Sequence, residues 1–189
     1  MSQNQTIETI LNRRSIRSYK PDPISESDLN TIIEAGQRAP YVWEDCRHFT
    51  VVKDRDLISR LNAAAIKAGS AINKEMREIF QQPGFDGTYG APCIIIVSGN
   101  EAALQHEAIC GASIENMLIA AKALGLGSCW VYFVIFAFHG EDAASFKEEL
   151  QIPEGFKPCA GVLLGYETEP FTEEEDVRWK NGVTFIKGK

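Results

Sequence analysis

The feature that most constrains the fold is a long helical pattern from about Glu101 to Leu124, which is apolar on nearly every side from Ile109 onward. A helix without a polar face must be buried, because water would otherwise contact apolar side chains around its whole circumference. Such a helix lies either at the heart of its own domain or in an interface between subunits. Two polar residues inside it, Glu115 and Asn116, are expected to bond neighbouring backbone groups, since buried polar groups need partners.

Length and composition predict one soluble domain over residues 1–189. Apolar residues make up 44% of the chain and charged residues 24%, which is typical of folded domains. The formal net charge is −7 and no basic stripe with interleaved aromatic residues occurs, so nucleic acid is excluded as a partner. The polar N-terminus does not resemble a signal peptide, and the longest apolar run, Cys129 to Phe138, is too short to span a bilayer. We therefore expect a cytoplasmic protein with no membrane partner.

Cysteine and histidine usage argues against a metal site. The five cysteines are widely spaced with no C-x-x-C pair, and an odd number in a chain without a leader favours free thiols. His106-Glu107 has no second histidine at helical spacing, which excludes a zincin motif. No Ser/His/Asp or Cys/His set is spaced for nucleophilic catalysis, and Cys129 is expected to be a packed strand residue. We therefore assign no catalytic side chain and no metal ligand.

Helix and strand patterns alternate irregularly along the chain. Capping signals at Thr6, Ser25 and Asp54 predict three helices, the second of which ends before Pro40. Further helices are predicted over about residues 72–80 and 141–150. Strands are predicted over residues 49–52, 93–97 and 159–165, and the run from Ser128 is expected to begin as a central strand. This alternation suggests a mixed sheet wrapped by helices, with Gly125 as the left-handed residue that ends the long helix.

Two apolar sets need cover that a small domain does not obviously supply. One is the long helix from Ile109 to Leu124, and the other lies in the tail from about residue 166 to residue 189. The tail carries Phe171, Trp179, Val183, Phe185 and Ile186. A separate apolar stripe of Ile7, Ile10 and Leu11 marks the first predicted helix. A tail with so many large apolar residues is expected to lie against another surface.

A basic cluster directly follows the first helical pattern. It consists of Arg13, Arg14, Ser15 and Arg17 in an otherwise acidic chain. Guanidinium groups match phosphate oxygens bidentately and keep their charge at any working pH, which favours a small-molecule phosphate site. The alternative is a solvated basic turn paired with the abundant acidic residues. No G-x-G-x-x-G motif follows a strand and no Walker A motif occurs, so neither a Rossmann nor a P-loop nucleotide site is supported.

Taken in order, six motifs resemble those of the nitroreductase family over about residues 7 to 179. They are Arg13-Arg14-Ser15-Ile16-Arg17, Arg38-Ala39-Pro40, Phe49-Thr50-Val51-Val52, Gly90-Ala91-Pro92, Glu115-Asn116-Met117-Leu118, and the run from Leu124-Gly125-Leu126-Gly127 to Ser128-Cys129-Trp130. Each motif is weak alone, and together their order and spacing are specific.

The resemblance implies an α+β fold, in which a central mixed sheet is flanked by helices and extended by the partner's C-terminal tail. It also implies an intertwined homodimer with two FMN molecules at the subunit interface. The implied activity is that of an FMN-dependent oxidoreductase, which takes hydride from NAD(P)H and reduces nitroaromatic, quinone or related small acceptors. Because the flavin carries the chemistry, the family uses no dedicated acid, base or nucleophile. One shared substrate position implies ping-pong kinetics.

The resemblance also implies which residues contact FMN. Arg13, Arg14, Ser15 and Arg17 would hold its phosphate and ribityl chain. The flavin of the other subunit would be reached by Pro40, Tyr41, Val42 and Trp43, and the ring would lie beside Trp130, Val131 and Tyr132.

Three departures from the family pattern concern the ring contacts and the substrate. The segment from Tyr41 to His48 lacks the usual polar residues and is one residue shorter. A glycine that commonly follows the Cys-Trp pair is replaced within Val131-Tyr132-Phe133. The tail has the acidic run 172–176 where relatives have a basic residue, leaving Arg178 or Lys180 as substitutes.

These departures leave other functions open. One alternative is a non-catalytic flavin-binding or flavin-storage protein on the same fold. Another is a flavoenzyme for one specific metabolite, with dehalogenase-like or dehydrogenase-like chemistry. Anaerobic reduction of the flavin by NAD(P)H distinguishes the enzyme from the storage protein.

Overall fold

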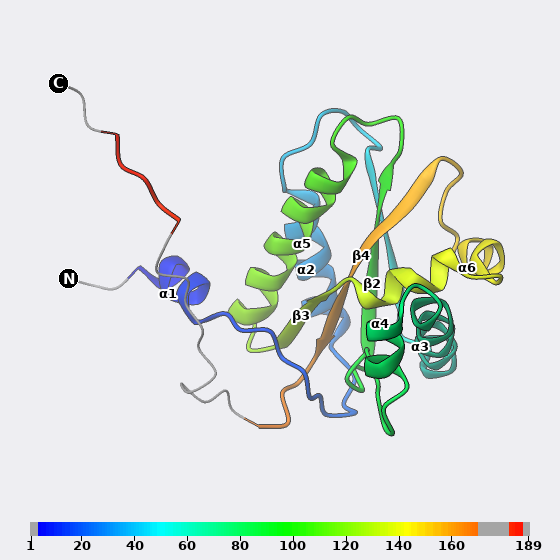
Figure 1. The fold of residues 1–189 in the computed structure, drawn as a ribbon. Helices are drawn as coiled ribbons and strands as arrows, with labels where there is room; N and C mark the ends of the chain where they lie inside the picture. Colours follow the sequence, from blue (N-terminus) through cyan, green and yellow to red (C-terminus); the bar gives the residue numbers. More distant parts are fainter. Residues whose placement is uncertain (1–3, 170–181, 187–189) are drawn as a thin grey trace.

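A four-stranded sheet forms the centre of the computed structural model, which describes residues 4–169 and 182–186 (Figure 1). The strands are β1 (Arg47–Val52), β2 (Cys93–Asn100), β3 (Gly127–Val131) and β4 (Phe156–Gly165), in the spatial order β1-β2-β4-β3. All neighbouring strands pair antiparallel. The mixed sheet predicted from the alternating patterns is therefore wrong for these strands. An alternation of helices and strands along the chain does not determine whether two paired strands run parallel or antiparallel. Among the described residues, parallel pairing is confined to an isolated bridge between Ser15 and Ser128.

The position of β3 differs from the prediction. We expected a central strand, but β3 lies at the edge, and β2 and β4 are central. Beyond Val131 the apolar run continues as a 3-10 helix, η1 (Phe133–His139), which is largely buried. Burial under other elements, and not central position, therefore explains the apolar character of this run.

Helices cover both faces of the sheet (Figure 1). On one face lie α2 (Glu26–Gln37) and α5 (His106–Ala123). On the other lie η1 and three helices, namely α3 (Arg55–Ser70), α4 (Lys74–Phe80) and α6 (Ala143–Glu149). The short α1 (Gln5–Asn12) stands apart from the sheet, beside α5.

The central strand β2 separates two hydrophobic cores. Its alternate residues Ile94 and Ile96 pack into the core under α3 and η1. Ile95 and Val97 pack into the core under α2 and α5. All four side chains are fully buried, which is why the strand reads as a continuous apolar run instead of an alternating one.

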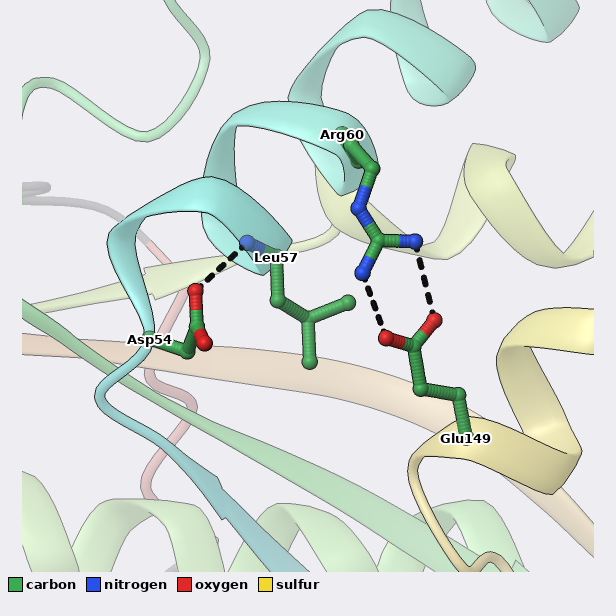
Figure 2. Close-up of polar contacts among 4 residues, drawn as sticks. All are labelled: Asp54, Leu57, Arg60 and Glu149. Carbon is green, nitrogen blue, oxygen red and sulfur yellow. Dashed lines mark hydrogen bonds and ion pairs between the residues drawn. The ribbon is translucent and has the colours of Figure 1, made fainter.

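The helix caps mostly follow the predictions. Ser25 accepts a hydrogen bond from the backbone N–H of Asp28 (3.0 Å), and Asp54 accepts one from that of Leu57 (3.0 Å; Figure 2). The N-cap of α1 is Asn4 and not Thr6, because the Asn4 amide oxygen accepts bonds from both Thr6 and Ile7.

The ends of α5 were predicted with unequal success. The helix begins at His106, five residues after the predicted start at Glu101, because residue 105 has a left-handed backbone (φ 61°) that interrupts the helix. At the other end, Gly125 has φ +76° and the N–H of Leu126 donates to the carbonyl of Ala121 (2.9 Å), as a glycine C-cap requires.

A bidentate ion pair connects two helices on the η1 side of the sheet. Figure 2 shows the Arg60 guanidinium of α3 facing the Glu149 carboxylate of α6, with two hydrogen bonds, one of them 2.9 Å long. Both side chains are largely exposed, so the pair fixes orientation more than it adds stability.

On the opposite face, α2 and α5 approach closely. The side-chain amide of Asn116 donates to the carbonyl of Ala35 (3.0 Å), which confirms its predicted backbone contact. Glu115 does not contact the backbone as predicted, and forms an ion pair with Arg13 instead (3.4 Å). The seven buried residues of α5 face the sheet and α2, while Glu115 and its neighbours on the other side are partly exposed.

Segments beyond β4 return to the N-terminal part of the chain. The backbone N–H of Lys20 donates to Tyr166 (2.8 Å), and Tyr19 and Glu167 form an antiparallel bridge. The predicted tail residues Phe171 and Trp179, with the acidic run and Arg178 and Lys180, lie outside the described residues. Val183, Phe185 and Ile186 are exposed. Among the described residues, no helix combines the length and apolar character needed to cross a membrane.

We predict that Gly36→Ala destabilises the protein, because a Cβ at this position would lie 2.3 Å from Cε of the fully buried Met117. Overpacking costs ~1–3 kcal/mol, and the better helix propensity of alanine offsets about 1 kcal/mol of that. Urea denaturation at fixed protein concentration measures the free energy of unfolding. Gly140→Ala is the control, since its Cβ would meet Ala68 at an ordinary 3.4 Å. Equal or greater stability of Gly36→Ala would contradict this packing.

Candidate functional site

The basic cluster lies on an extended arm that follows α1 and runs along the outer side of β3. The N–H of Ile16 donates to the carbonyl of Ser128 (2.9 Å), and Ser15 forms the parallel bridge to the same residue. This pairing brings the arm beside Cys129. Burial raises the pKa of the Cys129 thiol, while the positive charges of Arg17 and Arg13 and a hydrogen bond with Ser15 act in the opposite direction. The structure therefore gathers Arg13, Ser15 and Arg17 at one point of the sheet edge.

Arg13 has one side-chain donor without a partner in the part of the chain that the structure describes. Its side chain is 24% exposed, and its Nε pairs with Glu115 on α5 (3.4 Å). Its Nη1 is buried and has no hydrogen-bond partner among the described residues. A buried N–H group without a partner carries a desolvation penalty, which a bound anion would relieve. The alternative of a solvated, salt-bridged basic turn explains the ion pair of the Arg13 Nε. It does not explain why the Arg13 Nη1 is buried.

Arg14 and Arg17 are placed differently. The guanidinium of Arg14 donates to the carbonyls of Leu11 (2.7 Å) and Arg13 (2.8 Å). Arg14 thus stabilises the C-terminal end of α1, where cations are favoured. Arg17 is exposed and can contact a ligand from solvent.

The residues at the end of β3 alternate in exposure. Val131 is buried, so only its backbone is available to a ligand. The indole of Trp130 is exposed and lies over α5 at Gly111, and the exposed Tyr132 ring meets Phe136 edge to face at 5.7 Å. Two exposed aromatic side chains therefore lie at the end of β3, the strand that pairs with the arm.

The predicted ring-contact loop lies elsewhere. Residues 40–46 follow the C-terminal end of α2, and Figure 1 shows this end well away from the arm that follows α1. Tyr41, Val42 and Trp43 are all exposed. Tyr41, Trp43 and His48 help to line a surface hollow of about 490 Å³. Partial burial lowers the pKa of the His48 imidazole. One subunit thus does not bring Pro40–Trp43 to the arginine cluster.

Arg47 is the site residue that the sequence reasoning missed. Its guanidinium donates to the carbonyls of Gln37, Ala39 (3.0 Å) and Pro40 (3.2 Å), and lies 5.3 Å from the centre of the Tyr41 ring. Arg47 therefore fixes the start of the loop and the position of Tyr41. The available signal was a cation shortly after a predicted helix end, where carbonyl groups lack intrahelical partners.

No group of three His, Cys, Asp or Glu side chains within residues 4–169 and 182–186 is arranged to hold a metal ion. The donors that the structure does assemble are guanidinium and hydroxyl groups, which suit an anion such as a phosphate. The residues present therefore fit a phosphorylated ligand with an aromatic or apolar part.

Comparisons with known proteins identify a family and several similar structures. The sequence model of the nitroreductase family matches residues 10–166. A nitroreductase of Bacteroides fragilis with bound FMN is 32% identical, with a TM-score of 0.88 over 98% of this chain and 100% of that one. A nitroreductase of Desulfitobacterium hafniense with bound FMN is 26% identical, with a TM-score of 0.88 over the same shares.

A similar protein from Archaeoglobus fulgidus, provisionally named NADH dehydrogenase/NAD(P)H nitroreductase, is 29% identical over 91% of this chain and 92% of its own length. The family match spans most of the 189 residues, including the arm, both central strands and β3. This chain therefore belongs to the nitroreductase family.

Proposed function

We propose that this chain is an FMN-dependent oxidoreductase that takes hydride from NAD(P)H and reduces nitroaromatic, quinone or related small acceptors. The observation that carries the proposal is the cluster of Arg13, Ser15 and Arg17 beside β3, in which a buried Arg13 donor has no hydrogen-bond partner among the described residues. The relatives crystallised with FMN, and the relative named for NAD(P)H, support the choice of cofactor and reductant.

The proposal assigns roles to the chain's own residues. Arg13 and Arg17 would hold the phosphate of FMN with Ser15, and Arg14 would keep the arm in place by stabilising the end of α1. Trp130, Tyr132 and the backbone of Val131 would border the ring. When bound, FMN supplies the hydride and electron transfer chemistry, so the chain needs no acid, base or nucleophile of its own.

A homodimer would complete this site. In one subunit the stripe of α1 is exposed, as are the loop residues Tyr41 to Trp43 and the tail residues Val183 to Ile186. Scattered exposed apolar residues are ordinary, but three contiguous sets in one small protein favour an interface. We propose that Pro40, Tyr41, Val42 and Trp43 reach the cofactor held by the arginine cluster of a second copy, and that the tail packs on that copy.

We predict that Arg13→Ala and Arg17→Ala each weaken FMN binding. A lost charge-assisted phosphate contact costs roughly 1.5–3 kcal/mol, or about ten- to a hundredfold in affinity. Quenching of flavin fluorescence on titration with apoprotein measures the dissociation constant. Arg60→Ala is the matched control, because it removes an arginine that pairs with Glu149 on the other side of the sheet. Unchanged affinity in both cluster variants would place the phosphate elsewhere.

We predict a dimer in solution, stabilised in part by the α1 stripe. Ile7→Ser combined with Leu11→Ser should shift sedimentation at micromolar concentration toward the monomer, because both side chains are about half exposed in one subunit. Ile72→Ser, equally exposed in the connection between α3 and α4, serves as the control. A wild-type protein that sediments as a folded monomer would rule out the shared site.

We predict that NAD(P)H reduces the bound flavin under anaerobic conditions and that steady-state kinetics are ping-pong. NAD(P)H and the acceptor would occupy the same place in turn, beside Trp130 and Tyr132. Double-reciprocal plots should then give parallel lines, with each substrate competing against the other at high concentration. Intersecting lines would argue for two separate substrate positions. Flavin that stays oxidised under NADH and NADPH would favour the storage protein.

A further inference from the structure

Three of the five cysteines gather where the first turns of α5 meet β4. Cys110 of α5 is fully buried, and its thiol forms a hydrogen bond with the thiol of Cys159 on β4. The buried Cys46 lies close enough to interact electrostatically with Cys110. Cys159 alone among the five cysteines is partly exposed. No local sequence pattern marks this cluster, because the three residues are far apart along the chain.

Cys159 occupies an irregular position in its strand. Along β4, Ala160 pairs with Val97 and Pro158 pairs with Ser98, so Cys159 is an extra residue without a partner on β2. Such a bulge redirects a side chain out of the regular alternation of the strand. Here it brings Cys159 to the side of the sheet where Cys110 lies.

The neighbouring Gly99 leaves room for the pair. A Cβ at this position would lie 2.9 Å from Cβ of His106 and 3.1 Å from Sγ of Cys110, so no larger residue fits without displacement. The N–H of Gly99 also donates to the sulfur of Cys159. The packing thus places the Cys159 sulfur beside the Cys110 thiol and this backbone group, and the Cys159 thiol itself donates to the carbonyl of Lys157 (3.3 Å).

The two thiols differ in acidity. The hydrogen bond from Cys110, with smaller contributions from Gly99 and the charge of Lys157, lowers the pKa of Cys159 against the effects of burial and Glu107. The same hydrogen bond, followed by burial, raises the pKa of Cys110. Lys157 and Glu107 form an ion pair of 3.8 Å between β4 and α5 beside the thiols. Cys159 is also the partly exposed thiol of the pair, whereas Cys110 is fully buried, so a peroxide reaches Cys159 first, and the thiolate is the reactive form.

We propose that Cys159 and Cys110 form an oxidisable pair, in which a peroxide oxidises Cys159 and Cys110 then closes a disulfide between β4 and α5. In the first step the Cys159 sulfur attacks the O–O bond of hydrogen peroxide, an S–O bond forms, and the other oxygen leaves as water after protonation. In the second step the Cys110 sulfur attacks Cys159, the S–S bond forms, and the hydroxyl leaves as water with the Cys110 proton. Two thiols and one peroxide thus give one disulfide and two waters.

The pair involves none of the residues proposed to contact FMN, so this inference does not depend on the proposed function. Its location nevertheless connects it to the loop at the end of α2. Ile109, next to Cys110, packs with Cys46, and the carbonyl of Cys46 accepts a bond from Asn100 at the end of β2 (3.0 Å). A crosslink here would hold α5, β4 and the base of this loop in one arrangement.

The test uses the full-length protein with its bound cofactor and hydrogen peroxide as the oxidant. Thiol titration in denaturant should fall from five to three, since 5 − 2 = 3, and dithiothreitol should restore all five. Peptide mapping should show a Cys110–Cys159 crosslink. Before oxidation, an alkylating reagent should label Cys159 on the order of tenfold faster than the buried Cys93, whose pKa burial raises to about 11.

Variants separate the two steps. Cys110→Ser should leave Cys159 as a sulfenic acid that dimedone captures, whereas Cys159→Ser should abolish both the adduct and the crosslink. Cys93→Ser is the control and should form the disulfide as the unaltered chain does. Retention of five thiols, or a crosslink that excludes Cys159, would overturn the proposal. Mapping of the unaltered protein decides the question even if Cys110→Ser does not fold.

Discussion

The structure depends on the burial of the two central strands on both faces. Ile94 and Ile96 of β2 point into one core, and Ile95 and Val97 point into the other, so each face needs a layer of helices. On one side η1 and α3 supply that layer, and on the other α2 and α5 do. The close approach of α5 to α2 requires Gly36 opposite Met117, which shows how little space the second layer leaves. The positions of the sheet edges, and of everything attached to them, follow from this arrangement.

The candidate site is built on one of those edges. Because β3 has β4 on only one side, its other side is available to the arm, and the bond from Ile16 to Ser128 fixes the register there. That register brings Ser15 to Cys129 and Arg13 to Glu115 of α5. The ion pair holds one part of the Arg13 guanidinium while a buried nitrogen remains without a partner among the described residues. The helix α5, which packs in the core, therefore also orients Arg13 of the proposed phosphate site.

The second part of the proposed site lies at the end of α2, where Arg47 donates to the backbone carbonyls of Gln37, Ala39 and Pro40 and orients Tyr41. Its aromatic residues are exposed in one subunit, as is the apolar stripe of α1. A site divided between a rigid edge and a separate loop can be completed by symmetry, since each subunit then contributes one part to each of two sites. The cysteine cluster near the base of this loop adds a contact through which oxidation could act on its position.

The elements whose signals are local could be predicted from the order of the amino acids. Capping at Ser25 and Asp54, the left-handed Gly125 and the apolar run of β2 depend on hydrogen bonds and burial within a few residues, and the structure confirms each of them. The arginine cluster and the family motifs predicted the candidate phosphate site, which stays a prediction. The strand order, the edge position of β3 and the contact of Cys110 with Cys159 became evident only in the folded chain. These depend on which distant segments meet, and a local pattern carries no information about that, because burial by any neighbour selects the same apolar residues.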